Sequence, residues 1–250
     1  GVAGAFGNNP ATMVSLSLTY LQHRGHEAAS VVSTDGEVFH SFGGLGKPTV
    51  VFEKGLTAEM DQAFAAIGQN RYSTTGSSDN PFNIQPIRAE GPNGVVFGGH
   101  NGNFPDALIA ERLELEKLGA DFKSTMDSEV LVQMVAWAPG ENWLQRVSYV
   151  MNQVKNRGSF TLVLLTKDEM IMARDAHGNR PACFGEFDGG WLAASEDSVL
   201  RQFRCTNISH LNPGEVIIID KNGLTKHQGV ERGIQNWCSF EGSYLSLPSS

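Results

Sequence analysis

The chain reads Val95-Val96-Phe97-Gly98-Gly99-His100-Asn101-Gly102-Asn103 where an apolar run gives way to polar residues. The apolar part predicts a β-strand, and we expect the chain to turn directly after it. The Asn101-Gly102 step offers a side-chain amide donor beside a backbone N–H that no Cβ obstructs. These groups can form an oxyanion hole if a nucleophile lies about 3 Å from the same point. Asn-Gly is also a common hairpin turn, so the step alone leaves both interpretations open.

A second polar loop precedes this stretch and reads Arg71-Tyr72-Ser73-Thr74-Thr75-Gly76. The planar guanidinium of Arg71 can hold a substrate carboxylate through two parallel hydrogen bonds, and the neighbouring hydroxyls can donate or accept. Such a clamp together with an oxyanion hole indicates acyl transfer on a small, amino-acid-like substrate. Taken alone, Arg71 is better explained as a surface ion-pair residue.

Further motifs stand in a fixed order with these two loops. They are Leu21-Gln22-His23-Arg24-Gly25-His26-Glu27-Ala28-Ala29-Ser30, Ser124-Thr125-Met126-Asp127-Ser128-Glu129-Val130, Ala173-Arg174-Asp175-Ala176-His177-Gly178-Asn179-Arg180-Pro181 and Ala193-Ala194-Ser195-Glu196. The whole series resembles the class II glutamine amidotransferases, which are N-terminal-nucleophile hydrolases. Within that class it is most similar to the glutaminase domains of glutamine phosphoribosylpyrophosphate amidotransferases. The similarity extends from Gly1 to about Glu241.

The resemblance implies an α+β fold, the four-layer αββα sandwich of the N-terminal-nucleophile hydrolases. It also implies a glutamine amidotransferase type-2 domain over residues 1–241 and a C-terminal tail over residues 242–250. In the family, this last segment continues into a phosphoribosyltransferase domain. The sequence has no apolar strand followed by two acidic residues and a Gly/Thr-rich phosphate loop, so we expect no such domain in this chain.

In this family an N-terminal cysteine attacks the side-chain amide of glutamine, and its own α-amino group serves as the general base. A glutamyl thioester forms, ammonia leaves, and water releases glutamate. The resemblance implies these positions: Arg71, Thr74 and Thr75 at the glutamine α-carboxylate, Asp127 at the α-ammonium, Asn101 and Gly102 at the oxyanion, and Arg24 and Gly25 beneath the nucleophile. The alternative for Asp127 is a structural role as an N-cap or first-turn acid of the helix that follows.

The nucleophile itself is missing from the printed sequence. The family pattern begins Cys-Gly-apolar-apolar-Gly, and this chain matches it from the second position onward, as Gly1-Val2-Ala3-Gly4. The cysteines present are Cys183, Cys205 and Cys238, none of which can supply a free α-amine. We therefore expect the nucleophilic cysteine directly before Gly1. The alternatives are that the residue has been removed, or that the protein is a natural glutamine-binding relative without activity.

Composition describes an ordinary globular chain with an acidic balance. The 250 residues are 40% hydrophobic and 18% charged, which suffices for one domain with a buried core. The net charge of −8 argues against a nucleic-acid or anionic-membrane partner, both of which favour basic faces. No membrane span or secretory signal is visible. An odd number of scattered cysteines fits a reducing compartment, so we predict a cytoplasmic protein.

Periodicity predicts the elements around these motifs. Helices are expected over residues 107–118, 129–137 and 144–156, and strands over 37–42, 95–97, 160–165, 170–173, 183–185, 191–194 and 216–220. The strands between residues 160 and 194 are expected to form one meander. Glu196 is expected to cap a helix that begins near Val199. For Arg174, Asp175 and Arg180, an ion pair that fixes a turn is favoured over substrate contact.

The expected function is hydrolysis of L-glutamine to L-glutamate and ammonia, with the ammonia passed to a synthase partner or acceptor domain. No cofactor and no metal are expected, because the histidines lack the spacing of metal ligands. The sequence leaves the oligomeric state open. One alternative is a catalytically inactive glutamine-binding or regulatory module. Another is an amide hydrolase of the same fold that acts on a different substrate.

Overall fold

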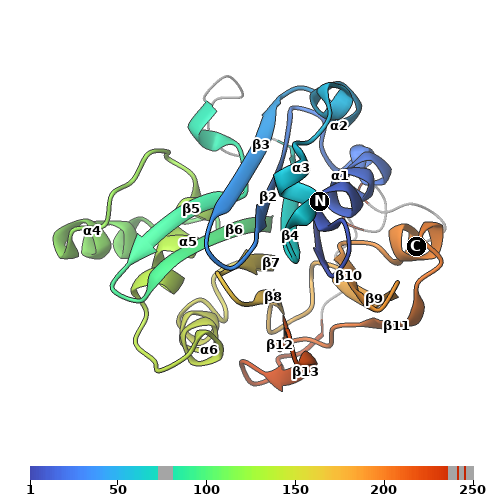
Figure 1. Cartoon of the computed structure of the whole chain (residues 1–250). Coiled ribbons are helices and arrows are strands. Elements are labelled where there is room, and N and C mark those ends of the chain that lie inside the picture. The colour runs from blue at the N-terminus through green and yellow to red at the C-terminus, as the bar shows by residue number, and fades with distance from the viewer. Residues whose placement is uncertain (73–80, 236–240, 242–244, 246–250) are drawn as a thin grey trace.

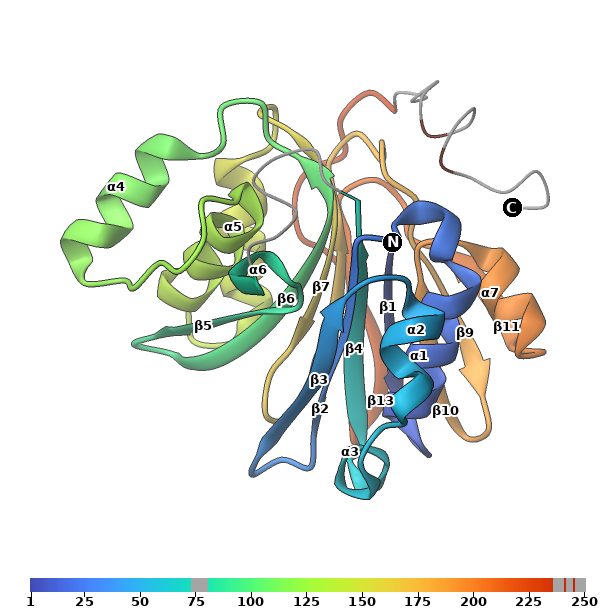
Figure 2. The ribbon, with the colours of Figure 1, turned by 90° about the horizontal axis from the view of Figure 1, so that it is seen from above.

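The computed structural model describes residues 1–72, 81–235, 241 and 245 (Figure 1). Two antiparallel sheets pack face to face, and helices cover the outer face of each (Figure 2). This arrangement confirms the predicted α+β sandwich with four layers. Thr74, Thr75 and Cys238 lie outside the described residues.

The first sheet has the strand order β11-β9-β10-β1-β4-β2-β3. Its strands are β1 (Val2–Phe6), β2 (Ala28–Thr34), β3 (Phe39–Leu45), β4 (Ala65–Arg71), β9 (Cys183–Phe187), β10 (Gly190–Ala194) and β11 (Thr206–His210). Every residue of β2 and β4 is buried, because these strands have helices on one face and the second sheet on the other. A strand covered on both faces needs a nearly continuous run of small or apolar residues rather than an alternating pattern.

The second sheet has the order β13-β12-β8-β7-β6-β5. Its strands are β5 (Ile87–Gly91), β6 (Gly94–Asn103), β7 (Ser159–Leu165), β8 (Met170–Arg174), β12 (Glu215–Asp220) and β13 (Gly223–Gln228). The predicted strand over residues 216–220 is β12, which pairs with β13 as a hairpin. The prediction of a single meander between residues 160 and 194 was wrong, because β7 and β8 belong to this sheet whereas β9 and β10 belong to the first.

The segment after β8 carries the chain from one sheet to the other. The Asp175 carboxylate accepts hydrogen bonds from the backbone N–H groups of Phe160, His177 and Asn179. The Arg174 guanidinium donates to the carbonyl oxygens of Gly178, Arg180 and Leu211. Side-chain-to-backbone hydrogen bonds therefore hold this crossing, rather than the expected ion pair. Such bonds satisfy backbone groups that no strand partner reaches.

Helices cover the two outer faces separately. The first sheet carries α1 (Pro10–Tyr20), α2 (Pro48–Val51), α3 (Ala58–Gln62) and α7 (Asp197–Gln202), and the second carries α4 (Ile109–Leu118), α5 (Asp127–Trp137) and α6 (Trp143–Gln153). Helix α4 ends at Gly119, whose φ of 102° is the left-handed conformation typical of a C-cap. Helix α7 begins at Asp197, earlier than the predicted Val199, and the Glu196 side chain makes no capping hydrogen bond.

Three apolar layers hold the sandwich together. One lies between the first sheet and its helices, one between the second sheet and its helices, and one between the sheets. The layer between the sheets includes Val2 and Ile67 from the first sheet and Phe97 and Val163 from the second. No described helix is long and apolar enough to cross a membrane.

Candidate active site

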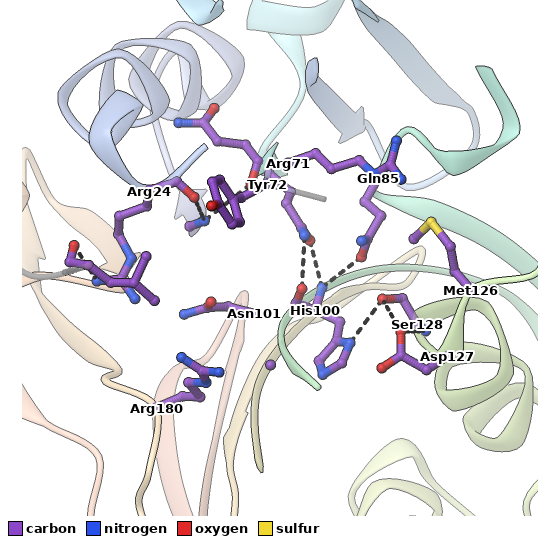
Figure 3. A pocket seen from close by; sticks show the side chains of 15 residues that line it. Arg24, Arg71, Tyr72, Gln85, His100, Asn101, Met126, Asp127, Ser128 and Arg180 are labelled. Atoms are coloured by element: carbon purple, nitrogen blue, oxygen red, sulfur yellow. Dashed lines mark hydrogen bonds between the residues drawn. The ribbon is translucent and has the colours of Figure 1, made fainter. Parts of the chain in front are cut away.

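A polar pocket lies where β1, β4 and β6 meet the start of α5 (Figure 3). Five of the predicted site residues line it together: Arg24, Arg71, Asn101, Gly102 and Asp127. The predicted Gly25 does not line it. A Cβ on Gly25 would lie 2.6 Å from the backbone of Arg71, so this glycine allows the two segments to approach closely.

The start of β1 forms one wall of the pocket. The Gly1 amino group donates to the Asn70 carbonyl oxygen at 3.2 Å, and the Asn70 N–H donates to the Gly1 carbonyl oxygen at 2.9 Å. This reciprocal pair extends the β1–β4 register, in which Val2 lies opposite Gln69. The next position upstream would lie opposite Arg71 and beside the pocket.

Asn101 and Gly102 lie inside β6, paired with Thr161 and Phe160 of β7. The predicted turn after Phe97 was therefore wrong. A Cβ on Gly102 would lie 2.0 Å from the Ser159 carbonyl oxygen, so glycine permits the close approach of β7 here. Gly102 lines the pocket, and its lack of a side chain also serves strand packing at this position.

The other edge of β6 is open to the pocket, because its pairing with β5 stops at Gly98. The N–H and C=O of His100 face this edge and bond to the Gln69 side chain at 2.6 and 2.8 Å. Backbone groups two residues apart on a strand face the same side, so the Gly102 N–H faces this edge too. The Asn101 Nδ2 atom is buried and has no hydrogen-bond partner among the described residues. Both donors belong to residues that line the pocket.

Arg71 ends β4 and Asp127 begins α5, and their residues are only 4% and 5% exposed. The Asp127 carboxylate accepts hydrogen bonds from the backbone N–H groups of Phe104 and Ser128, at 2.9 and 2.8 Å. Asp127 is thus a first-turn acid, while the N-cap position belongs to Met126. Asp127 can accept these two hydrogen bonds and still bind a group in the pocket, because a carboxylate has more acceptor sites than the two bonds use.

His100 links β6 to α5. Its Nδ1 atom lies 2.9 Å from the Ser128 hydroxyl, and its buried Nε2 atom has no partner among the described residues. Burial lowers the pKa of His100 below its usual value, although the negative charge of Asp127 opposes the shift. The imidazole is therefore a neutral group that fixes the two elements relative to each other.

A chain of ion pairs runs behind the pocket. Glu196 accepts from Arg24 at 2.7 Å and lies 2.8 Å from the His23 ring nitrogen. Arg24 also pairs with Glu241, and Glu241 accepts from Arg180 at 2.8 Å. Burial acts to raise the pKa of Glu196, but hydrogen bonds from His23 and Arg24 outweigh it and hold the pKa below its usual value.

Sequence patterns missed the ion-pair roles of three members of this chain: Glu196, Arg180 and Glu241. Glu196 was expected to cap a helix, and it does occupy the N-cap position of α7. Arg180, which lines the pocket, was expected to stabilise a turn. Glu241 lies beyond the last strand, and no local pattern connects it to Arg24. The sequence signal for a role at the site was the order of the motifs, because Glu196 and Arg180 both belong to the motif series described in the sequence analysis.

The described cysteines do not supply a nucleophile. Burial raises the pKa of the Cys183 thiol well above its usual value and that of Cys205 to about 11. Both thiols are therefore protonated near neutral pH, and the thiolate is the reactive form. Among the described residues, no group of three or more His, Cys, Asp and Glu side chains is arranged to hold a metal ion.

The sequence of this chain is similar to those of known glutamine amidotransferases. The family model described as a glutamine amidotransferase domain matches residues 69–202. The chain is 36% identical over 252 residues to the chloroplastic amidophosphoribosyltransferase of Vigna aconitifolia, covering all of this chain and 51% of that protein. It is 31% identical over 252 residues to the amidophosphoribosyltransferase of Bacillus subtilis, covering all of this chain and 52% of that protein.

The fold of this chain is also similar to that of a solved structure. The glutamine phosphoribosylpyrophosphate amidotransferase of B. subtilis, determined with ADP and GMP, matches with a TM-score of 0.87 and 29% sequence identity. The match covers 99% of this chain and 53% of that one. The chain thus spans about half the length of the relatives it matches.

Proposed function

Because the chain belongs to the class II glutamine amidotransferase family, we propose that it hydrolyses L-glutamine to L-glutamate and ammonia. The nucleophile is a cysteine directly before Gly1. One observation supports the proposal: if the β1–β4 register continued one residue beyond Gly1, that position would lie opposite Arg71, which lines the same pocket as Asn101 and Gly102. A nucleophile and two oxyanion donors then share one site.

The reaction follows from these positions. Arg71 holds the α-carboxylate of glutamine and Asp127 holds its α-ammonium, with Thr74 and Thr75 beside Arg71. The thiol loses its proton to the cysteine's own α-amine and attacks the amide carbon, and the oxyanion is stabilised by Asn101 Nδ2 and the Gly102 N–H. The amine returns the proton to the leaving nitrogen, so ammonia departs and a thioester remains. Water attacks the thioester in the same way and releases glutamate.

The environment at the start of β1 favours the uncharged amine that a general base requires. Gly1 and Val2 are buried, and burial disfavours the charged form of an amine that adjoins the same wall one position upstream. A base is most effective when its pKa lies near the working pH. Arg24 lies beneath this position, since a Cβ on Gly1 would meet its side chain at 3.2 Å.

The ammonia passes to an acceptor domain or a synthase partner. The relatives that cover all of this chain are named amidophosphoribosyltransferases and are about twice as long, so the acceptor chemistry belongs to sequence outside this match. We assign the glutamine amidotransferase domain to residues 1–241 and the tail to residues 242–250. The cytoplasm remains our predicted compartment, although the Vigna relative is named as chloroplastic.

The test is the intact mass of the purified protein before and after treatment with a glutamine-analogue electrophile, together with glutamate release from L-glutamine. We expect a mass one cysteine larger than the printed sequence, one adduct on the N-terminal peptide, and protection by excess L-glutamine. A mass equal to the printed sequence with no adduct would indicate a binding module without a nucleophile. Turnover of amides that lack an α-carboxylate would indicate a different substrate.

A further inference from the structure

The charges around the pocket fall into two groups. Arg24 and Arg180 flank Asn101, where the proposed function puts the side-chain amide of glutamine, while Asp127 lies beyond His100 (Figure 3). Glutamine carries one positive and one negative charge at its α-carbon, which Asp127 and Arg71 match one for one. Its side-chain amide is neutral, so two guanidinium groups at that end need to be compensated by the protein.

Glu196 and Glu241 supply that compensation. Arg24 pairs with both carboxylates, and Arg180 pairs with Glu241 at 2.8 Å. Two guanidinium groups and two carboxylates make the amide end neutral overall. The side chains of Arg24 and Glu196 are each 1% exposed and that of Glu241 is 9% exposed, so water screens these charges poorly.

We propose that Glu241 sets the preference of this pocket for a neutral side-chain amide over a carboxylate, and so limits binding of the product L-glutamate. The inference rests on the proposed function. Without the charge of Glu241, the amide end carries an excess positive charge directly beside Asn101. A carboxylate side chain would then be attracted to the site, whereas a neutral amide would gain little.

Glu241 lies beyond β13, the last described strand, and the Leu245 carbonyl oxygen also accepts a hydrogen bond from Arg24, at 3.1 Å. Both residues therefore contact Arg24 from the part of the chain that follows β13.

Glu241 acts through Arg24 and Arg180 and is a positioning residue, so its test must separate charge from structural damage. The variants are Glu241→Gln, which leaves one excess positive charge, Arg180→Met, which leaves one excess negative charge, and the doubly substituted protein, which is neutral. Glu231→Gln is the matched control, because it removes the same charge from an exposed carboxylate that pairs with Lys155.

The measurement is titration calorimetry of the purified chain with two ligands. One is L-glutamate. The other is L-methionine sulfoxide, whose side chain is neutral, has a polar oxygen and contains no hydrolysable amide. We expect Glu241→Gln to bind L-glutamate about tenfold more tightly and Arg180→Met about tenfold more weakly, since one charge at short range in a poorly screened site has at least this effect. The double variant and Glu231→Gln should resemble the parent protein, and the sulfoxide should bind all variants within about threefold.

The outcomes separate this inference from the proposed function. If the parent protein binds neither ligand, both are overturned. If it binds the sulfoxide but the ratio of the two dissociation constants is the same in all variants, the role of Glu241 is overturned while glutamine recognition stands. If Glu241→Gln fails to fold, Arg180→Met still decides, because an unchanged affinity for L-glutamate in that variant contradicts the inference.

Discussion

The side-chain amide of Gln69 forms two reciprocal hydrogen bonds with the backbone of His100. Gln69 belongs to β4 in the first sheet and His100 to β6 in the second. The amide therefore replaces a missing strand neighbour and ties the sheets together one residue before Asn101. The proposed nucleophile extends β1, which pairs with β4, whereas the oxyanion donors lie on β6. The proposed mechanism therefore requires a fixed distance between the two sheets.

Replacement of Gln69 by Leu should reduce turnover far more than substrate binding. The variant keeps the volume of the side chain but loses both bonds to His100, and a displacement of about 1 Å at a reacting centre can cost on the order of 100-fold in rate. Steady-state kinetics of glutamate release would measure kcat and KM separately. Gln153→Leu, on the exposed end of α6, is the control for the same change. A Gln69→Leu enzyme with unchanged kcat would show that the amide is not needed for alignment.

Replacement of Asn101 by Gly should lower kcat by about 10² to 10³ through loss of one oxyanion donor. Because the donor acts on charge that develops only in the transition state, the affinity for L-glutamine should persist. Single-turnover assays and equilibrium binding would measure the two effects. If binding disappears together with turnover, Asn101 contacts the ground-state substrate and its assignment is wrong.

Replacement of Arg71 by Lys should act in the opposite way, raising KM with a smaller change in kcat. Lysine keeps the charge but cannot form two parallel bonds to a carboxylate. Kinetics with L-glutamine, and with an analogue whose α-carboxylate is amidated, would measure the contribution. An unchanged KM, or equal loss for both substrates, would remove Arg71 from the carboxylate clamp.

Replacement of Glu196 by Gln should destabilise the protein near neutral pH by about 3 to 5 kcal/mol, the usual cost of breaking a buried ion pair. The pKa of Glu196 is lowered in the folded state, so the unfolded chain binds more protons in the acid range. The stabilisation is therefore present above the ordinary glutamate pKa and is lost as the pH falls through the lower folded value. Urea unfolding from pH 7 to pH 3 would measure it.

The parent protein and Glu196→Gln should converge in stability as the pH falls. Glu231→Gln, in which the substituted side chain is 87% exposed, should differ little from the parent at any pH. A difference between parent and Glu196→Gln that stays constant across the range would mean that the ionised carboxylate is not what stabilises this site.

Local features of the fold were predictable from the sequence because local interactions determine them. The end of α4 at Gly119 and the hairpin between β12 and β13 follow from nearby glycines and apolar periodicity. The division of β7, β8, β9 and β10 between two sheets was not predictable in this way. Hairpin signals report which strands are adjacent in the chain, and the hydrogen bonds of Asp175 that send the chain to the other sheet are not part of any periodicity.

For the candidate site, too, only residues in local sequence motifs could be predicted. Arg24, Arg71, Asn101, Gly102 and Asp127 were found because they belong to recognisable motifs, and the structure brings them together. Gln69 and Glu241 were missed, since each acts on a segment far away in sequence. The turn predicted directly after Phe97 does not form, because pairing with β7 keeps Asn101 and Gly102 in an extended strand.

Gly99 lies beside the apolar layer between the sheets, and its lack of a side chain lets the two sheets approach closely there. A Cβ there would lie 2.9 Å from the Gln69 side-chain oxygen and 3.5 Å from a methyl group of Val2, both on the first sheet. An added methyl group at Gly99 would therefore be too close to atoms of the first sheet, and it would increase the spacing between the sheets beneath the pocket. Under the proposed mechanism, apolar residues that do not contact glutamine set the spacing between the nucleophile and the oxyanion donors. A protein with a repacked core could then be fully stable and still turn over slowly.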